Sequence, residues 1–192
     1  LAHAGKKVSA EGDTYLIAEN GPLRPEAPEA LVRRMRASFN VLGPLAGRPG
    51  EARVPLPGGC VLGPRPVDFH LNGLRALGLE VALHQGVVHA RARRLRGAAI
   101  HLDFPSVGAT QHLMMTAALI PEPTTIHNAA QEPEVYELIH LLAQMGARVQ
   151  AAPGRIEVHG GARLGGARYR VIPDRLNAGT YLIAGALCGG EV

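Results

Sequence analysis

Three stretches of the chain share one pattern, in which an apolar helix end is stopped by a glycine and followed by two short strands of alternating polar and apolar residues. Because a period of two residues is typical of a half-buried strand, each stretch is predicted to form a β-hairpin after its glycine. The stretches start at Leu1, Leu74 and Leu141, and their stop glycines are Gly5, Gly78 and Gly146. Spacings of 73 and 68 residues between these glycines indicate an internal repeat.

Two kinds of helix are expected in each copy of the repeat. Helices that precede a stop glycine carry apolar residues at three- and four-residue steps, which predicts an amphipathic outer helix. These residues are Val67, Leu71, Leu74 and Leu77 in one copy and Val135, Leu138, Leu142 and Met145 in the next. The other kind opens with small residues, in segments that start at Arg36, Gly108 and Ala178. Its stretch Leu113–Leu119 is apolar nearly all round, so we expect such helices to be buried on every side.

These elements predict an α/β fold built from βαβαββ units. The expected architecture is an inside-out α/β prism with pseudo-threefold symmetry, in which the inner helices are buried and the sheets lie outside. The sequence starts within one unit and ends within a helix of a further unit, so we expect a part of something larger. Residues 1–173 are expected to form one domain that lacks the first part of its opening repeat, and residues 174–192 to start the crossing into a second domain.

Composition narrows the classes of partner. Lys6 and Lys7 are the only lysines among 20 basic residues, and the arginines that make up the rest suit phosphate and carboxylate groups. Anionic small molecules are therefore expected partners, whereas 4% aromatic residues are too few for the stacking platforms of a nucleic-acid binder. No apolar run is long enough to cross a bilayer, so no membrane is expected. Two cysteines without a secretory signal favour a cytoplasmic location.

The stretch LPGGCVLGPRPVD, Leu56–Asp68, is the strongest candidate for chemistry. It is too rich in glycine and proline to form a helix or a strand, so it is predicted to be a loop. Cys60 follows two glycines there, and Arg65 stands between two prolines. Cys188, in contrast, falls in an apolar helix, where packing in the core is the better interpretation.

Five motifs then carry a resemblance that covers essentially the whole chain. They are LPGGCVLGPRPVDFH, MRAS at Met35–Ser38, FPSVGAT at Phe104–Thr110, NAAQEPE at Asn128–Glu134 and IPDRLNAGT at Ile172–Thr180. In order and spacing they closely resemble the UDP-N-acetylglucosamine enolpyruvyl transferases. The resemblance implies transfer of the enolpyruvyl group from phosphoenolpyruvate to the 3-hydroxyl of UDP-N-acetylglucosamine with release of phosphate, the first committed step of peptidoglycan precursor synthesis. It also implies a cytoplasmic enzyme that serves cell shape and cell division and is the target of fosfomycin.

The resemblance implies a role for each candidate site residue, and implies no cofactor and no metal. Cys60 resembles the general acid of the family, and Arg65 the residue that contacts phosphoenolpyruvate and the nucleotide. The other implied contacts are Arg36 near phosphoenolpyruvate, Pro66, Asp68 and Phe69 at the uridine, His70 near the sugar nucleotide, Ser106, Val107 and Gly108 at the diphosphate, and Glu132 and Glu134 close to the site.

Structural roles remain open beside the implied ones. Ser106 is equally an ordinary helix N-cap, and Glu132 and Glu134 would stabilise a helix start in any protein. Arg36 could equally be a member of an ion pair within the fold. Asp174 matches a family position at the junction between domains, with no catalytic role expected.

Departures from the family pattern leave the activity of this chain in question. Asn177, His127 and Gln131 stand where the family commonly has an acidic, an acidic and a basic residue. Family residues that complete the site lie outside this sequence, so we expect the 192-residue chain alone to have little activity. An inert binding module of the same fold and a shikimate-pathway enolpyruvyl transferase remain as alternatives. The segment Asn177–Val192, a helix of the inner kind, could fill the gap left in the opening repeat.

Overall fold

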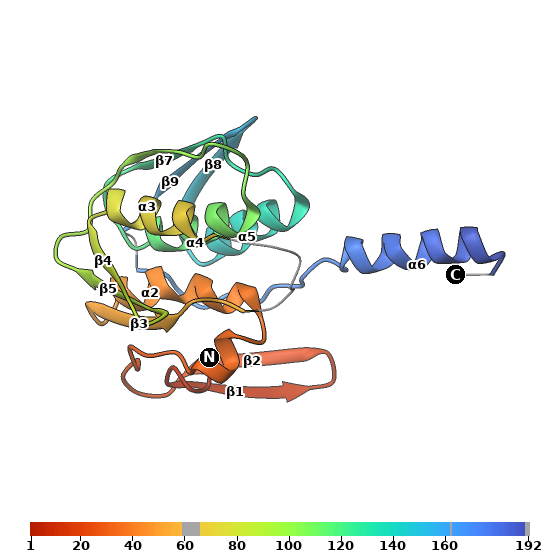
Figure 1. Ribbon diagram of the computed structural model, residues 1–192, viewed down its shortest axis with the longest axis horizontal. Helices are drawn as coiled ribbons and strands as arrows, with labels where there is room; N and C mark the ends of the chain where they lie inside the picture. Colours follow the sequence, from red (N-terminus) through yellow and green to blue (C-terminus); the bar gives the residue numbers. More distant parts are fainter. Residues whose placement is uncertain (59–65, 162, 191–192) are drawn as a thin grey trace.

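The computed structural model describes residues 1–58, 66–161 and 163–190, which form three sheets around buried helices (Figure 1). The first sheet pairs β1 with β2, the second has the order β3-β5-β4, and the third has the order β6-β7-β9-β8. The strands are β1 Lys6–Glu11, β2 Thr14–Glu19, β3 Glu51–Pro55, β4 Leu79–His84, β5 Val87–Ala92, β6 Ala99–His101, β7 Thr124–His127, β8 Arg148–Ala152 and β9 Arg155–His159. The helices are α1 Glu29–Val32, the 3-10 helix η1 Arg36–Val41, α2 Leu42–Gly47, α3 Asp68–Ala76, α4 Val107–Ala117, α5 Pro133–Gln144 and α6 Arg175–Cys188.

The strand pairing confirms the internal repeat and the α/β class. In the third sheet, β6 runs parallel to β7, and β7 and β8 both pair antiparallel with β9. The second sheet has the same order, because β3 and β4 both pair antiparallel with β5 and Glu26 forms a parallel bridge to Arg53 on the other side of β3. The first sheet contains only the hairpin, β1 against β2. The second and third copies of the repeat therefore share one strand order and the same strand directions.

Each predicted stop glycine occupies the turn before a hairpin. Gly5, Gly78 and Gly146 have φ values of 93°, 92° and 106°, in the left-handed region that glycine enters without steric cost. A side chain at Gly78 would also collide with the carbonyl oxygen of Arg94. Gly78 and Gly146 reverse the chain between a helix and a hairpin, from α3 to β4 and from α5 to β8, whereas Gly5 follows a turn and precedes β1.

Helix α4 lies at the centre of the fold, as the apolar run predicted. It packs against α2, α3 and α5, and its residues Leu113, Met114 and Ala117 are fully buried. Helices α3 and α5 bury one face each, through Leu71 and Leu74 and through Val135, Ile139 and Leu142. The expected division into a buried inner helix and amphipathic outer helices is thus confirmed for this part of the chain.

Helices α2 and α4 touch at Gly43, which permits no side chain. A Cβ built there would collide with the hydroxyl of Thr116 and would lie 3.0 Å from both Nε2 of His112 and a methyl group of Leu74. We expect Gly43→Ala to lower the free energy of unfolding by about 1 to 3 kcal/mol, because overpacking a tight core forces the backbone apart. Denaturant unfolding measures this change. Gly179→Ala is the matched control, since a Cβ at this helical glycine meets nothing within 4 Å; equal stability of the two variants would contradict the prediction.

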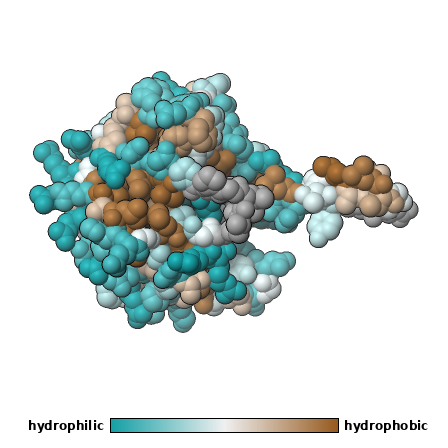
Figure 2. All heavy atoms as spheres, viewed as in Figure 1, coloured by the Kyte–Doolittle hydropathy of each residue, from teal (hydrophilic) through white to brown (hydrophobic). Residues whose placement is uncertain are grey.

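Helix α6 departs from the prediction for inner helices. It extends away from the body of the molecule (Figure 1), and none of its residues is buried. Hydrophobic side chains are visible along its surface (Figure 2). The exposed ones include Leu176, Tyr181, Leu182, Ile183 and Leu187. Cys188 is exposed as well, so the prediction that it packs in a core is wrong. The apolar pattern of a helix predicts that it needs a cover, but no described residue covers this one.

An apolar groove of about 460 Å³ lies among the N-terminal residues, α1, η1 and α2. Leu23, Leu31, Val41, Leu45 and Met115 are among the side chains that line it. Helix α6 does not line this groove and none of its residues is buried, so the prediction that the segment from Asn177 packs into the opening repeat is wrong for the part that the structure describes. The asparagine at the start of that segment instead lies beside Asp174, at the capped beginning of α6.

Candidate active site

Eight of the residues singled out in the sequence line one pocket of about 630 Å³. They come from three separate segments: η1, the start of α3 with the residues before it, and the start of α4 with its N-cap. They are Arg36, Pro66, Asp68, Phe69, His70, Ser106, Val107 and Gly108. Glu132 and Glu134 do not line this pocket, and Cys60 and Arg65 lie outside the described residues. The fold therefore brings together segments that are about 30 and 40 residues apart in the sequence.

The N-terminus of α4 forms one wall of the pocket. Ser106 is its N-cap, and its hydroxyl accepts a hydrogen bond of 3.4 Å from the backbone N–H of Ala109. The first N–H groups of a helix have no partner within the helix and carry its positive dipole end, so they attract anions. The structural and the implied roles of Ser106 are compatible, because one residue both caps α4 and lines the pocket.

Two phenylalanine rings form another wall. Phe69, in the first turn of α3, meets Phe104 edge to face with ring centroids 4.7 Å apart. Asp68 precedes Phe69 as the first residue of α3 and is exposed. This wall thus offers an apolar surface next to a carboxylate, a combination that suits a planar base with N–H donors.

Arg36 joins η1 to the segment before α3. Its guanidinium donates a hydrogen bond of 3.1 Å to the carbonyl oxygen of Pro66. Arg36 also lies close enough to His70 to disfavour a positive charge on the imidazole. The carbonyl of Pro66 is thus one partner of this guanidinium, and the ion pair held open from the sequence stays a prediction.

His70 forms the floor of the pocket, and a second buried histidine, His112, lies behind it. Nδ1 of His70 lies 2.9 Å from Nδ1 of His112, which projects from the centre of α4. Burial, followed by the charge of Arg36, lowers the pKa of His70 to about 4, against the opposing effect of Asp68. Complete burial, followed by His70, holds the pKa of His112 well below its usual range. Both imidazoles are therefore neutral near pH 7. His112 was missed in the sequence, where a histidine inside the apolar run HLMMTAAL was its one signal.

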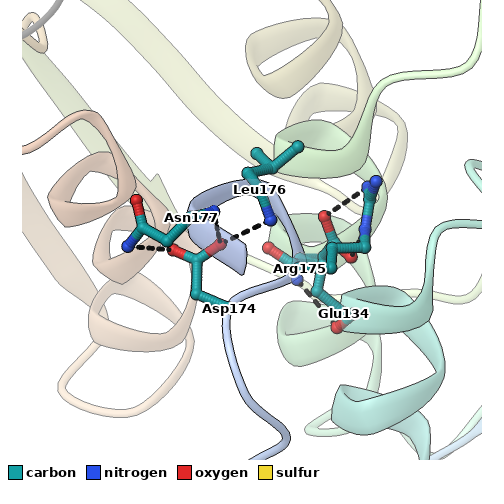
Figure 3. Close-up of polar contacts among 6 residues, drawn as sticks. Glu134, Asp174, Arg175, Leu176 and Asn177 are labelled. Carbon is teal, nitrogen blue, oxygen red and sulfur yellow. Dashed lines mark hydrogen bonds and ion pairs between the residues drawn. The ribbon is translucent and has the colours of Figure 1, made fainter. Parts of the chain in front are cut away.

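Glu134 stands beside the pocket and binds the start of α6 (Figure 3). Its carboxylate accepts hydrogen bonds of 3.1 and 3.0 Å from Nε and one terminal nitrogen of Arg175, and this contact lowers the pKa of Glu134. Its backbone carbonyl accepts a hydrogen bond of 3.0 Å from Gln111, a residue that lines the pocket. Glu132 occupies the N-cap position of α5 and makes no side-chain capping bond. The EPE segment thus connects the pocket to α6 without contributing a carboxylate to the pocket.

The three departures from the family pattern lie outside the pocket lining. Asn177 donates a hydrogen bond of 3.2 Å to Asp174, the N-cap of α6 (Figure 3). The ring of His127 stacks on that of His101 at 4.2 Å, across the parallel pair of strands β6 and β7. Gln131 is exposed just before α5. Asp174 caps α6 by accepting from the N–H groups of Leu176 and Asn177, at 2.9 and 3.2 Å.

The described residues contain no group of three or more His, Cys, Asp and Glu side chains that could hold a metal ion. In the same residues, no helix combines the length and apolar character needed to cross a bilayer.

Comparisons with known proteins bear on this site. The chain is 47% identical over 194 residues to UDP-N-acetylglucosamine 1-carboxyvinyltransferase 1 of Halalkalibacterium halodurans, covering 100% of this chain and 44% of that protein. It is 52% identical over 162 residues to UDP-N-acetylglucosamine 1-carboxyvinyltransferase of Gloeobacter violaceus, covering 84% of this chain and 35% of the relative. The chain thus spans less than half the length of these curated relatives.

The fold has solved counterparts. The crystal structure of the enolpyruvyl transferase NikO from Streptomyces tendae superimposes with a TM-score of 0.81 at 25% identity, over 96% of this chain and 44% of that one. The family described as EPSP synthase (3-phosphoshikimate 1-carboxyvinyltransferase) matches residues 1–192. The protein therefore belongs to the EPSP synthase family of carboxyvinyl transferases.

Proposed function

We propose that the complete protein containing this chain transfers the enolpyruvyl group of phosphoenolpyruvate to the 3-hydroxyl of UDP-N-acetylglucosamine. The observation that carries the proposal is the convergence of eight residues, singled out from sequence motifs, on one pocket. Identity of 46% to 52% with five proteins named UDP-N-acetylglucosamine 1-carboxyvinyltransferase supports this acceptor over 3-phosphoshikimate.

The reaction assigns a task to each part of the site. The acceptor hydroxyl oxygen bonds to C2 of phosphoenolpyruvate, its proton is lost, and C3 receives a proton; elimination then breaks the bond from C2 to the phosphate oxygen and removes a proton from C3. Cys60 is proposed as the general acid that protonates C3, and Arg65 and Arg36 as the groups that bind the phosphoenolpyruvate anion. Every bond exchanged belongs to the two substrates, so no oxidant or reductant is consumed.

The walls of the pocket fit the nucleotide sugar. Ser106, Val107 and Gly108 present the N-terminus of α4, which suits the diphosphate. Pro66, Asp68 and Phe69 would surround the uracil, with the carboxylate accepting from the ring N–H. His70 would contact the sugar nucleotide from the floor. Glu132 and Glu134 remain candidates for a role close to the pocket. Glu134 accepts hydrogen bonds from Gln111, which lines the pocket, and from Arg175.

We also propose that residues 1–173 form one domain and that residues 174–192 begin the crossing into a second domain of the same protein. The fully exposed apolar surface of α6 supports this division, because such a helix needs a partner surface. Closure of the second domain over the pocket would exclude water from the reacting groups.

The substrates place the proposed reaction in the cytoplasm, at the start of peptidoglycan precursor synthesis. Cell shape and cell division would depend on it, and fosfomycin, an electrophile that resembles phosphoenolpyruvate, would inhibit it.

Phosphate release by the complete protein tests the proposal. We expect phosphoenolpyruvate to release phosphate with UDP-N-acetylglucosamine as acceptor and not with 3-phosphoshikimate, and we expect little or no release by the 192-residue chain alone. Binding of the nucleotide sugar without turnover would instead support an inert module of the same fold. Turnover with 3-phosphoshikimate alone would replace the proposed acceptor.

A further inference from the structure

His70 at the floor of the pocket and His112 behind it belong to a series of hydrogen bonds that starts at a backbone group. The N–H of Gly43, in α2, donates to Nε2 of His112 at 2.9 Å. The other ring nitrogen of His112, Nδ1, lies 2.9 Å from Nδ1 of His70. Both contacts are buried, and they join α2, α4 and α3.

A backbone N–H can only donate, and this fixes the proton positions along the chain of hydrogen bonds. Nε2 of His112 must be the acceptor, so the proton of this neutral ring lies on Nδ1. That proton is donated to Nδ1 of His70, which must in turn be an acceptor. His70 therefore carries its own proton on Nε2.

The surroundings keep both rings in these orientations. Phe39, only 1% exposed, meets the rings of His70 and His112 edge to face at centroid distances of 5.5 and 5.9 Å. Burial also disfavours a second proton on either ring, since a charged imidazole would lose its solvation. The hydrogen-bond pattern is therefore not free to invert by ring rotation or by protonation near neutral pH.

Nε2 of His70 is the last nitrogen in this series of hydrogen bonds. No described residue forms a hydrogen bond with it, although the His70 side chain is only 6% exposed. The ring lines the pocket, and the site of a Cβ on Gly108 would be 3.6 Å from Nε2. The unpaired N–H thus lies next to the first turn of α4, where unpartnered backbone N–H groups already favour an anion.

We propose that His112 is a positioning residue, which holds His70 in the Nε2–H tautomer so that its N–H donates to an anionic group of the ligand at the N-terminus of α4. The role in ligand binding rests on the proposed function. The tautomer of His70 rests only on the hydrogen bonds and does not require that function. His112 contacts no ligand in this scheme; its effect reaches the pocket only through His70.

Nitrogen NMR of the complete protein, labelled with ¹⁵N-histidine and free of ligand, tests the tautomer directly. The long-range proton–nitrogen correlations of His70 should show a protonated Nε2 and an unprotonated Nδ1, and those of His112 the reverse. This readout requires no activity. A proton on Nδ1 of His70 would overturn the inference even if the protein proved to be the proposed transferase.

Substitution of His112 then tests the positioning role. His112→Leu removes both ring nitrogens, and we expect it to raise KM for UDP-N-acetylglucosamine about tenfold, the effect of one hydrogen bond to a charged group, with a smaller change in kcat. An amide carries one acceptor and one donor, so His112→Asn or His112→Gln should restore KM and the Nε2–H signal of His70.

Controls separate this role from a structural one. His140→Leu, at an exposed histidine of α5, should leave both KM and the His70 spectrum unchanged. Denaturant unfolding of each variant shows which are folded at the assay temperature. A folded His112→Leu protein with the KM of the parent, or amide variants no better than leucine, would overturn the positioning role.

Discussion

Replacement of Phe39 by alanine is expected to lower the free energy of unfolding by about 3 to 5 kcal/mol, because it leaves a large cavity in the core. The ring is 1% exposed and is part of the cluster that includes Leu42, Leu74 and Leu113. Its edge contacts also restrain both buried histidines, so the same variant should loosen the floor of the pocket. Urea unfolding, monitored by circular dichroism, measures the stability change.

Phe104→Ala is the matched control for this prediction. It removes the same ring from a side chain that is 60% exposed and touches Phe69 at the rim of the pocket. We expect a loss of about 1 kcal/mol or less, the contribution of one exposed aromatic pair. If both variants unfold at the same denaturant concentration, the prediction is wrong, and the Phe39 ring contributes no more to stability than an exposed one.

The repeat could be predicted from sequence because its signals are local. A glycine that ends a helix needs only its own left-handed conformation, and an alternating strand needs only one buried face. Gly5, Gly78 and Gly146 therefore marked the same turn in three copies, and the structure has all three turns. Asp68 and Ser106 likewise stand at helix starts, Asp68 as the first residue of α3 and Ser106 as the N-cap of α4.

Contacts between distant segments were beyond such signals. The hydrogen bond between Gly43 and His112 depends on how closely α2 approaches α4. No local sequence pattern at either residue predicts that they are in contact. The pairing of Glu134 with Arg175 is similar, since acidic residues at a helix start are common without any partner. For α6, hydrophobic periodicity indicated an apolar surface but not what covers it, and the prediction of burial was wrong. Sequence patterns thus predicted elements and pocket residues, and the structure supplied the hydrogen bonds that orient them.

Replacement of Cys60 by alanine is expected to lower kcat of the complete protein by about 10²- to 10⁴-fold, the usual contribution of a general acid in proton transfer. Protonation of C3 has to occur as the acceptor oxygen bonds to C2, and alanine has no proton to give. The proposed binding groups, among them Arg36 and Ser106, remain in place in this variant. KM should therefore change much less than kcat.

The second cysteine supplies the control. Cys188 is exposed on α6, away from the pocket, so Cys188→Ala should retain full turnover and should still react at Cys60 with an electrophile that resembles phosphoenolpyruvate. Phosphate release and mass spectrometry of the labelled protein measure the two effects. A folded Cys60→Ala protein that keeps the parental kcat would show that another group delivers the proton.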